Sequence, residues 1–491
     1  MTVYDTNGSK RNNRARWQGV DPVIEARRQQ LHFGEGLIAE EVSDLREDWM
    51  KQADRVLEDQ QLVATVYEAL TRRRPKSRTR GRKGTPAEVV LRLLLLKHIR
   101  NWSYQVLERE VRANLVYRDF TRVGAWKVPD AKMMGRWGLA LQPEEVEKIH
   151  ARIVAIAQEN QVVKGRKMRV DTTVVETDIH YPTDSSLLGD GVRVLVRAMK
   201  RIGEIACGQG AKLRDRSRSV KLRILEIGRI ARTRGGPNRE RLQQGYEKLL
   251  SSVSRVVGQA KRFSCEIADG MKRAGEVMRQ AALESLRQEV ETIVPRVQQV
   301  MRQTKQRVFG GDTHVAEKLV SIFEPTTEII RKGKASKPTE FGKMVKIQEA
   351  ENQIITDYAV YAKRPSDSDL LIDAIETHQQ RLGCTPHVAA ADAAFYSSKN
   401  EAAAHERGVT RVCIPNRSTK SADRKREQKK RWFKQGQKWR TGCEGRISVL
   451  KRRHGLRRCH YKGEAGMQRW VGLGVIADNL INIGNVLALK K

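Results

Sequence analysis

The chain has 491 residues, with 94 Lys and Arg against 58 Asp and Glu, and a formal net charge of +36. Such an excess of positive charge needs a polyanionic partner, and nucleic acid is a better candidate than an anionic membrane surface. In the sequence, no apolar run approaches the ~18 residues that a membrane span needs, and the N-terminus does not resemble a signal peptide. We therefore expect a soluble cytoplasmic protein without a membrane partner. The six cysteines lack C-x2-C spacing, so reduced thiols are expected and a structural zinc site is not.

Residues 1–83 are expected to form short helices followed by a basic linker. Eight of the twelve residues from Arg72 to Lys83 are basic, and Pro75 and Gly81 interrupt them. Such a run is either a solvated loop or an arm that contacts phosphates without reading sequence.

Residues 84–160 are predicted to form a helical DNA-binding domain. Pro86 can begin a helix over 87–98, and Ser103 can cap a second helix over 105–115. Two short helices around a tight turn resemble a helix-turn-helix, although any small helical bundle gives a similar pattern.

Residues 161–190 are predicted to form the first part of an α/β domain. Residues 168–180 alternate as a strand does, which places Asp171, Thr173 and Val175 on one face. Residues 191–310 are then predicted to be an all-α insertion of three to five long helices, serving as a DNA clamp, a dimer arm, or both.

Residues 311–491 are predicted to complete the α/β domain. The expected strands are 343–349, 353–362, 388–391 and 409–414. The expected helices are 366–382, 397–407, 444–454 and 470–487.

Three isolated carboxylates carry the functional interpretation. Glu444 lies between Lys420 and Lys462, where 17 Lys and Arg stand against only three acids. A carboxylate among phosphate-binding cations is repelled by the phosphates unless a divalent metal lies between them. Asp171 and Asp392 stand in or directly after apolar, strand-like runs. Together the three predict a site for two Mg²⁺ ions, replaceable by Mn²⁺, in an enzyme that cuts or joins DNA.

Four segments, in this order, resemble a bacterial insertion-sequence transposase of the DDE class. They are Val170–Leu188, Arg331–Lys334 with Glu340–Gly342, Ala391–Ser397, and Cys443–Ser448. Pro86 to Leu115 resembles the helical N-terminal domain of that family, and the whole resemblance covers about 84–190 and 315–485. It implies an RNase H-like mixed sheet with flanking helices, interrupted by the all-α insertion, plus a helical N-terminal DNA-binding region.

The resemblance assigns the catalytic and metal-binding carboxylates to Asp171, Asp392 and Glu444. Related transposases carry a Y-x2-R-x3-E-x6-K signature, which Arg440, Glu444 and Lys451 fit, whereas Gln437 replaces the Tyr. The residues expected to contact DNA are Arg440, Lys451, Arg446, Arg452, Arg453 and Trp439.

The resemblance also implies a reaction. Water activated by metal hydrolyses a phosphodiester at each transposon end, and the freed 3′-hydroxyl attacks target DNA. The expected partners are double-stranded DNA, as terminal inverted repeats and as target, and a second copy of the chain in a dimer or larger assembly at the bacterial nucleoid. Two alternatives remain, a nuclease that cuts without joining and a catalytically silent DNA-binding repressor.

Overall fold

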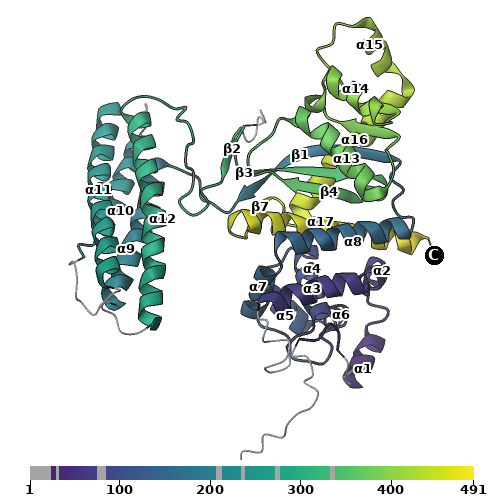
Figure 1. The fold of residues 1–491 in the computed structure, drawn as a ribbon, viewed down its shortest axis with the longest axis horizontal. Helices are drawn as coiled ribbons and strands as arrows, with labels where there is room; N and C mark the ends of the chain where they lie inside the picture. The colour runs from purple at the N-terminus through teal and green to yellow at the C-terminus, as the bar shows by residue number, and fades with distance from the viewer. Residues whose placement is uncertain are drawn as a thin grey trace, which may run out of the picture. The chain divides into compact units, whose positions relative to one another are not determined.

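The computed structural model describes residues 24–28, 33–73, 84–205, 213–233, 238–270, 277–331 and 338–490 (Figure 1). Most of the predicted basic linker lies outside the described residues. The fold is mixed α/β, as expected. The chain forms two compact units, unit 1 from residues 1–175 and 344–491, and unit 2 from residues 176–343.

The first part of unit 1 is a cluster of helices. They are α1 (Phe33–Glu41), α2 (Asp48–Leu57), α3 (Gln60–Arg73), α4 (Ala87–Ile99), α5 (Tyr104–Ala113), α6 (Leu115–Phe120), α7 (Ala131–Ala140) and α8 (Pro143–Glu159). The helices predicted at 87–98 and 105–115 are confirmed as α4 and α5, and the Ser103 hydroxyl accepts from the Val106 N–H at 3.2 Å.

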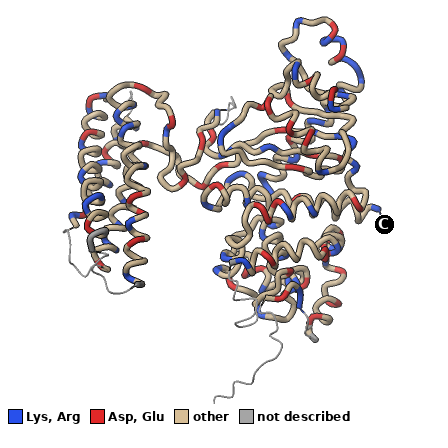
Figure 2. Tube along the Cα trace, in the orientation of Figure 1, with Lys and Arg blue, Asp and Glu red and all other residues tan. Residues whose placement is uncertain are grey.

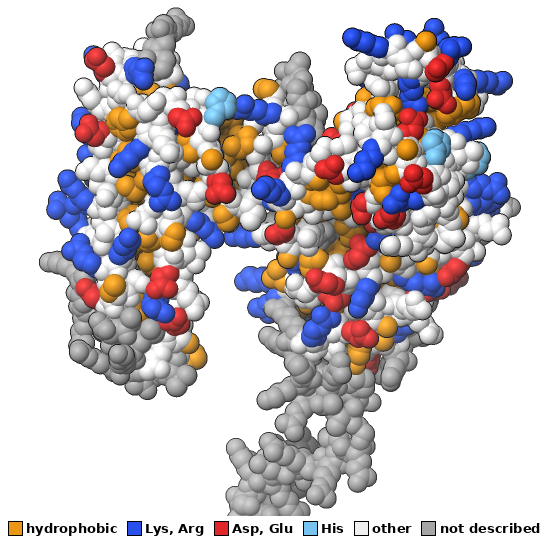
Figure 3. Space-filling model, turned by 45° about the horizontal axis from the view of Figure 1, so that its top comes forward, with side chains coloured by type: hydrophobic (Ala, Val, Ile, Leu, Met, Phe, Trp, Pro, Cys, Tyr) orange, Lys and Arg blue, Asp and Glu red, His pale blue; other side chains and the backbone are white. Residues whose placement is uncertain are grey.

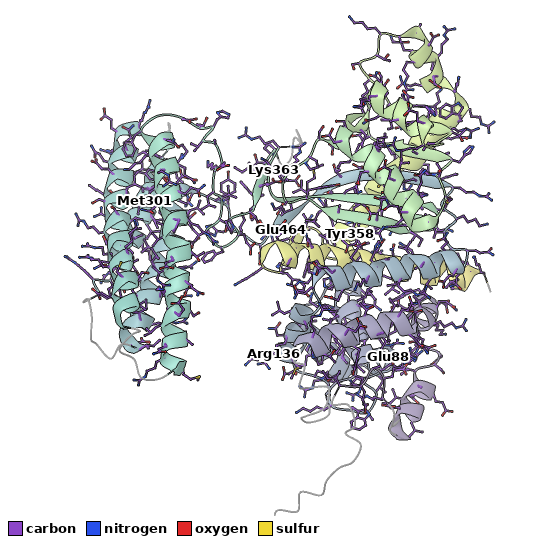
Figure 4. The ribbon with its side chains drawn as sticks, viewed as in Figure 1. Glu88, Arg136, Met301, Tyr358, Lys363 and Glu464 are labelled. Carbon is purple, nitrogen blue, oxygen red and sulfur yellow. The ribbon has the colours of Figure 1, made fainter. Side chains whose placement is uncertain are left out.

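Helix α4 is the centre of this cluster, because every residue along it is buried. Its two charged residues in the first turns therefore need partners inside the protein. Arg92 donates to Glu88 at 3.0 Å and also pairs with Asp54 of α2. Glu88 lies among these N-terminal helices (Figure 4).

A mixed sheet forms the second part of unit 1. Its order is β3-β1-β5-β6, with β4 paired to β3 and β7 paired to β1. The strands are β1 (Lys167–Thr177), β3 (Glu340–Glu349), β4 (Ile355–Val360), β5 (Val388–Ala391), β6 (Arg411–Cys413) and β7 (Arg458–Cys459). β1 runs parallel to β5, and β5 parallel to β6, whereas β3 and β4 are antiparallel. The chain leaves unit 1 inside β1 and returns inside β3.

Five helices accompany these strands. They are α13 (Leu370–Leu382), α14 (Ser398–Glu406), α15 (Ala422–Lys429), α16 (Arg431–Arg453) and α17 (Gly463–Leu489). Gly383 ends α13 in the left-handed conformation at φ 68°, as its position predicts. Tyr358 on β4 (Figure 4) packs edge-on against His150 of α8, with ring centroids 5.1 Å apart.

Helix α16 begins at Arg431, well before the predicted start at Glu444. Helix α17 corrects another expectation, because it is long and apolar enough to cross a membrane by length and composition alone. It is the one such helix in the described part of the chain, and 67% of its most apolar stretch is buried. Within unit 1 it packs closely on α2, where a Cβ on Gly484 would lie 2.4 Å from the Trp49 carbonyl oxygen.

The described residues of unit 2 form four long helices and a short strand. They are α9 (Asp184–Ile205), α10 (Ser217–Ala231), α11 (Arg239–Gly270), α12 (Val277–Val308) and β2 (Glu328–Ile330). The helical segment begins at Asp184, before the residue 191 expected from the sequence. Asp184 is buried and accepts from Arg307 of α12 at 2.5 Å, which joins the first helix to the last.

Candidate active site

Asp171 lies within β1, and Asp392 directly follows β5, the strand paired with it. Residues 167–170 of β1 lie in parallel register with residues 388–391 of β5, and Val170 is the partner of Ala391. Asp171 and Asp392 are the next residues along the chain. Parallel neighbours lie about 4.8 Å apart, so the register makes Asp171 and Asp392 neighbours on adjacent strands, at the point where β5 ends.

The two aspartates have the same local support. Asp171 Oδ1 accepts from the Thr172 backbone N–H at 2.7 Å, and Asp392 Oδ1 accepts from the Ala393 N–H at 2.7 Å. Both side chains are half-buried. Thr172 itself is turned to the other face of the strand, where its hydroxyl donates to Asp367 at 2.9 Å.

Glu444 and Arg440 come from α16, one helical turn apart. Arg440 Nη2 donates to Glu444 Oε1 at 2.9 Å, and Arg440 Nη1 lies 3.8 Å from Asp171 Oδ2. The Arg440 side chain is 10% exposed, whereas that of Glu444 is 61% exposed. Arg440 therefore links the strand that bears Asp171 to the helix that bears Glu444.

A buried network fixes α16 against the sheet. Arg169 Nε donates to Glu349 Oε2 at 2.8 Å, and its Nη1 donates to the Trp439 carbonyl oxygen. The Arg169 guanidinium also lies 4.7 Å from the centre of the Trp439 ring. Gly442 allows this approach, because a Cβ there would lie 2.3 Å from Arg169 Nη1.

This network was missed by the reasoning from sequence, although one signal pointed to it. Arg169 is a charge in the middle of an apolar, strand-like run, and a buried charge needs a partner. Its partner Glu349 ends a distant strand, so spacing alone does not reveal the pair.

Cys443 faces the same interior. It is buried, and burial, followed by the negative charges of Glu349 and Asp171, raises its pKa well above the usual value. A thiol held in its neutral form is a poor nucleophile, so Cys443 acts here as a packing residue.

The residues expected to contact DNA fall into two groups. Arg452 and Arg453 are exposed at the end of α16, and Lys451 and Trp439 are half-buried. Arg446 is buried, and its Nη1 donates to Asp478 of α17 at 2.7 Å. Its guanidinium is thus engaged inside unit 1, as that of Arg440 is.

The carboxylates do not form a closed metal site in this conformation. Among the described residues, no group of three or more His, Cys, Asp and Glu side chains is gathered closely enough to hold a metal ion. The donor chemistry nevertheless fits, because carboxylate oxygens are the ligands that Mg²⁺ prefers. The guanidinium of Arg440 lies beside Asp171 and Glu444, and its Nη1 has no hydrogen-bond partner, so this contact is a loose one.

Two segments of the chain match known protein families. Residues 39–138 match a family described as "Transposase domain (DUF772)", and residues 399–483 match a family described as "Transposase DDE domain". The two matches together support an insertion-sequence transposase of the DDE class. The first match spans most of the N-terminal helices of the chain, and the second includes Glu444 and all of α16. Asp171 and Asp392 lie outside both matches, and no curated protein or solved structure matches the chain.

Proposed function

We propose that this chain is a transposase that hydrolyses phosphodiesters at transposon ends and transfers the freed 3′-hydroxyl into target DNA. The observation that carries the proposal is the register of β1 and β5, which makes Asp171 and Asp392 neighbours on adjacent strands. Helix α16 reaches these strands through the contact of Arg440 with Asp171, and it carries Glu444 one turn further on.

In this proposal Asp171, Asp392 and Glu444 hold two divalent cations, Mg²⁺ or Mn²⁺. Bound there, such ions lower the pKa of a water molecule and neutralise the charge that develops on the phosphate. The protein's own contribution is to orient the carboxylates. The backbone N–H groups of Thr172 and Ala393 each hold one oxygen of their aspartate, which leaves the second oxygen to bind a cation.

The basic end of α16 would hold the DNA backbone beside these carboxylates. Arg452 and Arg453 are exposed there, and Lys451 is half-buried. Each is suited to a phosphate contact that positions DNA without reading its sequence. Arg440 would not contact DNA directly, and its guanidinium would offset the negative charge of Asp171 and Glu444.

The proposed fold is an RNase H-like sheet that the helices of 191–310 interrupt. An antiparallel pair, β3 and β4, continues into the parallel strands β1, β5 and β6, which supports that assignment. The N-terminal helices are the proposed reader of the terminal repeats, and cutting two ends requires at least two copies of the chain on DNA.

The test is cleavage of a duplex carrying the element's own ends, with Mg²⁺ or Mn²⁺, by wild type, Asp392→Asn and Asp423→Asn. Asp423 is the matched control, because it is an exposed carboxylate of unit 1 paired only with Arg426 of its own helix. We expect wild type and Asp423→Asn to cut and join, and Asp392→Asn to bind the ends without cutting. Cutting without joining would favour a nuclease. Equal behaviour of Asp392→Asn and wild type would remove the proposed site.

A further inference from the structure

Helix α10 of unit 2 carries positive charge that the described residues do not neutralise. Between Leu213 and Thr233 there are seven Lys and Arg and two acids, Asp215 and Glu226. Asp215 is already paired with Lys200 of α9 at 2.6 Å. Within the part of the chain that the structure describes, none of the seven cations has a carboxylate oxygen within 4 Å. They are Arg214, Arg216, Arg218, Lys221, Arg223, Arg229 and Arg232.

On helix α12 of the same unit, by contrast, a cation is paired with nearby carboxylates. On α12, Arg287 donates to Glu284 at 3.0 Å and lies 3.3 Å from Glu291. Figure 2 shows Lys, Arg, Asp and Glu together along the helices of unit 2. Nearby carboxylates therefore neutralise a cation of α12, whereas no such carboxylate is described beside the cations of α10.

The cations of α10 are accessible. Only Val220 and Ile227 of this helix are buried, so α10 lies on the surface of the bundle. Arg218, Lys221 and Arg229 are exposed, as are Arg214 and Arg232 beside the helix. Arg216 and Arg223 are half-buried, and their Nε atoms are buried without a hydrogen-bond partner. Burial, followed by the neighbouring charges of Arg214 and Arg255, lowers the pKa of Arg216, as expected where guanidinium groups crowd together without an anion.

A groove between α9 and α10 extends the same positive surface. It has a volume of about 580 Å³ and lies within unit 2. Val192, Val196 and Val220 contribute to its apolar part. The cations along it are Arg193, Arg197, Lys200 and Lys221, of which Arg193 is paired with Asp190 and Lys200 with Asp215. Figure 3 shows Lys and Arg side chains standing between apolar ones on the visible face of unit 2.

We infer that α10, with Arg214 and Arg216 before it, is a second DNA-binding surface that contacts the phosphate backbone without reading sequence. The inference rests on the proposed function, which supplies the DNA. Duplex DNA has one charge per about 1.7 Å of its axis, and cations that neutralise phosphates gain free energy by releasing counterions. Arg218 and Arg229 are separated by about 16 Å along the helix, so α10 is long enough to meet several phosphates.

The exposed apolar residues of α10 raise the question of a protein partner in place of DNA. Leu222 and Leu225 are 59% and 50% exposed, and with Arg218 and Arg229 they form one outward stripe. Such a stripe also fits an acidic amphipathic helix. DNA is the better match, because apolar side chains do not compensate the seven unpaired cations and a phosphate backbone does.

The experiment compares two full-length variants that lose the same charge. One replaces Arg214, Arg216 and Arg218 by Gln, and the control replaces Arg279, Arg287 and Arg302 of α12 by Gln. Binding to a duplex of arbitrary sequence is measured from about 50 to 200 mM salt. The slope of log K against log salt is negative, and each lost phosphate contact makes it less steep by about 0.9. For the α10 variant we expect a slope less steep by about 2 to 3 and affinity at least about tenfold weaker at 100 mM salt.

Further variants distinguish DNA binding by α10 from a folding defect and from a general effect of net charge. Replacing the same three arginines by Lys keeps the charge and should restore the slope, which excludes a folding defect. Equal losses in the α10 and α12 variants would show a net-charge effect and overturn the inference, as would an unchanged slope or an effect of Leu222→Ser alone. Cutting by wild type and Asp392→Asn is scored separately, so the active-site proposal can fail while the α10 result stands, and the reverse.

Discussion

Arg169 and Glu349 form an ion pair inside unit 1, directly beneath the helix that carries Glu444. The Arg169 side chain is 6% exposed and that of Glu349 is 0% exposed. The pair ties β1 to β3, and through the Trp439 carbonyl oxygen it also ties β1 to α16. The position of Glu444 relative to Asp171 therefore depends on a charge pair that takes no direct part in the proposed chemistry.

Replacing Gly442 by Ala should disturb this arrangement. The added Cβ would lie 2.3 Å from Arg169 Nη1, so either the guanidinium or α16 must move. We expect a loss of about 1–3 kcal/mol in the free energy of unfolding of unit 1, with slower DNA cleavage because Arg440 and Glu444 move with the helix. Tryptophan fluorescence during urea unfolding reports unit 1 alone, since all eight Trp lie outside residues 176–343.

Gly445 provides the matched control on the same helix. A Cβ at Gly445 meets nothing within 4 Å. Gly445→Ala should therefore be neutral or stabilise by about 0.5–1 kcal/mol, as expected in a helix interior. If both alanines had the same effect, close packing against Arg169 would not be the reason for the glycine at 442.

A double-mutant cycle tests the pair itself. Arg169→Met should cost about 3–5 kcal/mol of unfolding free energy, because it leaves the Glu349 carboxylate buried without its partner. Adding Glu349→Met should recover part of that loss, since two apolar side chains of similar size replace two charges. Additive losses in the double variant, within about 0.5 kcal/mol, would mean that the two residues act independently.

Lys97 predicts a pH dependence in the N-terminal helices. Its ammonium is buried, 4.5 Å from the Trp470 ring and 5.1 Å from the Tyr104 ring. Burial lowers the pKa of Lys97 from 10.5 to about 8. Between these two pH values the unfolded chain holds the proton that the folded chain has released, so stability rises with pH across this window.

The measurement is unfolding of wild type and Lys97→Met between pH 7 and pH 10.5. Wild type should gain stability relative to the variant by an amount on the order of 3 kcal/mol, at 1.36 kcal/mol per pKa unit. The difference should persist at about 0.5 M salt, because buried charges are screened little. A constant difference between the two proteins would show that the ammonium titrates as it does in water.

The sequence anticipated the elements of the site better than their arrangement. Asp171 could be placed in its strand because residues 168–180 alternate with period two, and Asp392 could be placed after its strand because Val388 to Ala391 is a continuous apolar run. The register of the two strands then makes them neighbours. The start of α16 was missed because Arg431 to Cys443 is polar, and its helical phase is set by buried contacts from Phe433, Arg440 and Cys443. The burial of Arg446 depends on Asp478, a residue of another helix, and no local pattern encodes that distance.

The contact between Arg440 and the carboxylates gives a prediction about metal binding. Arg440 Nη2 donates to Glu444 at 2.9 Å, and Nη1 lies 3.8 Å from Asp171. A guanidinium at this place repels a divalent cation and competes for the same oxygens. Arg440→Met should therefore bind Mn²⁺ more tightly than wild type, by about tenfold or 1.4 kcal/mol, in calorimetry without DNA. Cleavage should nevertheless fall in this variant, because the helix loses its link to β1. Weaker Mn²⁺ binding by Arg440→Met would show instead that the guanidinium holds the carboxylates in their binding positions, and Asp423→Asn should leave the Mn²⁺ affinity unchanged.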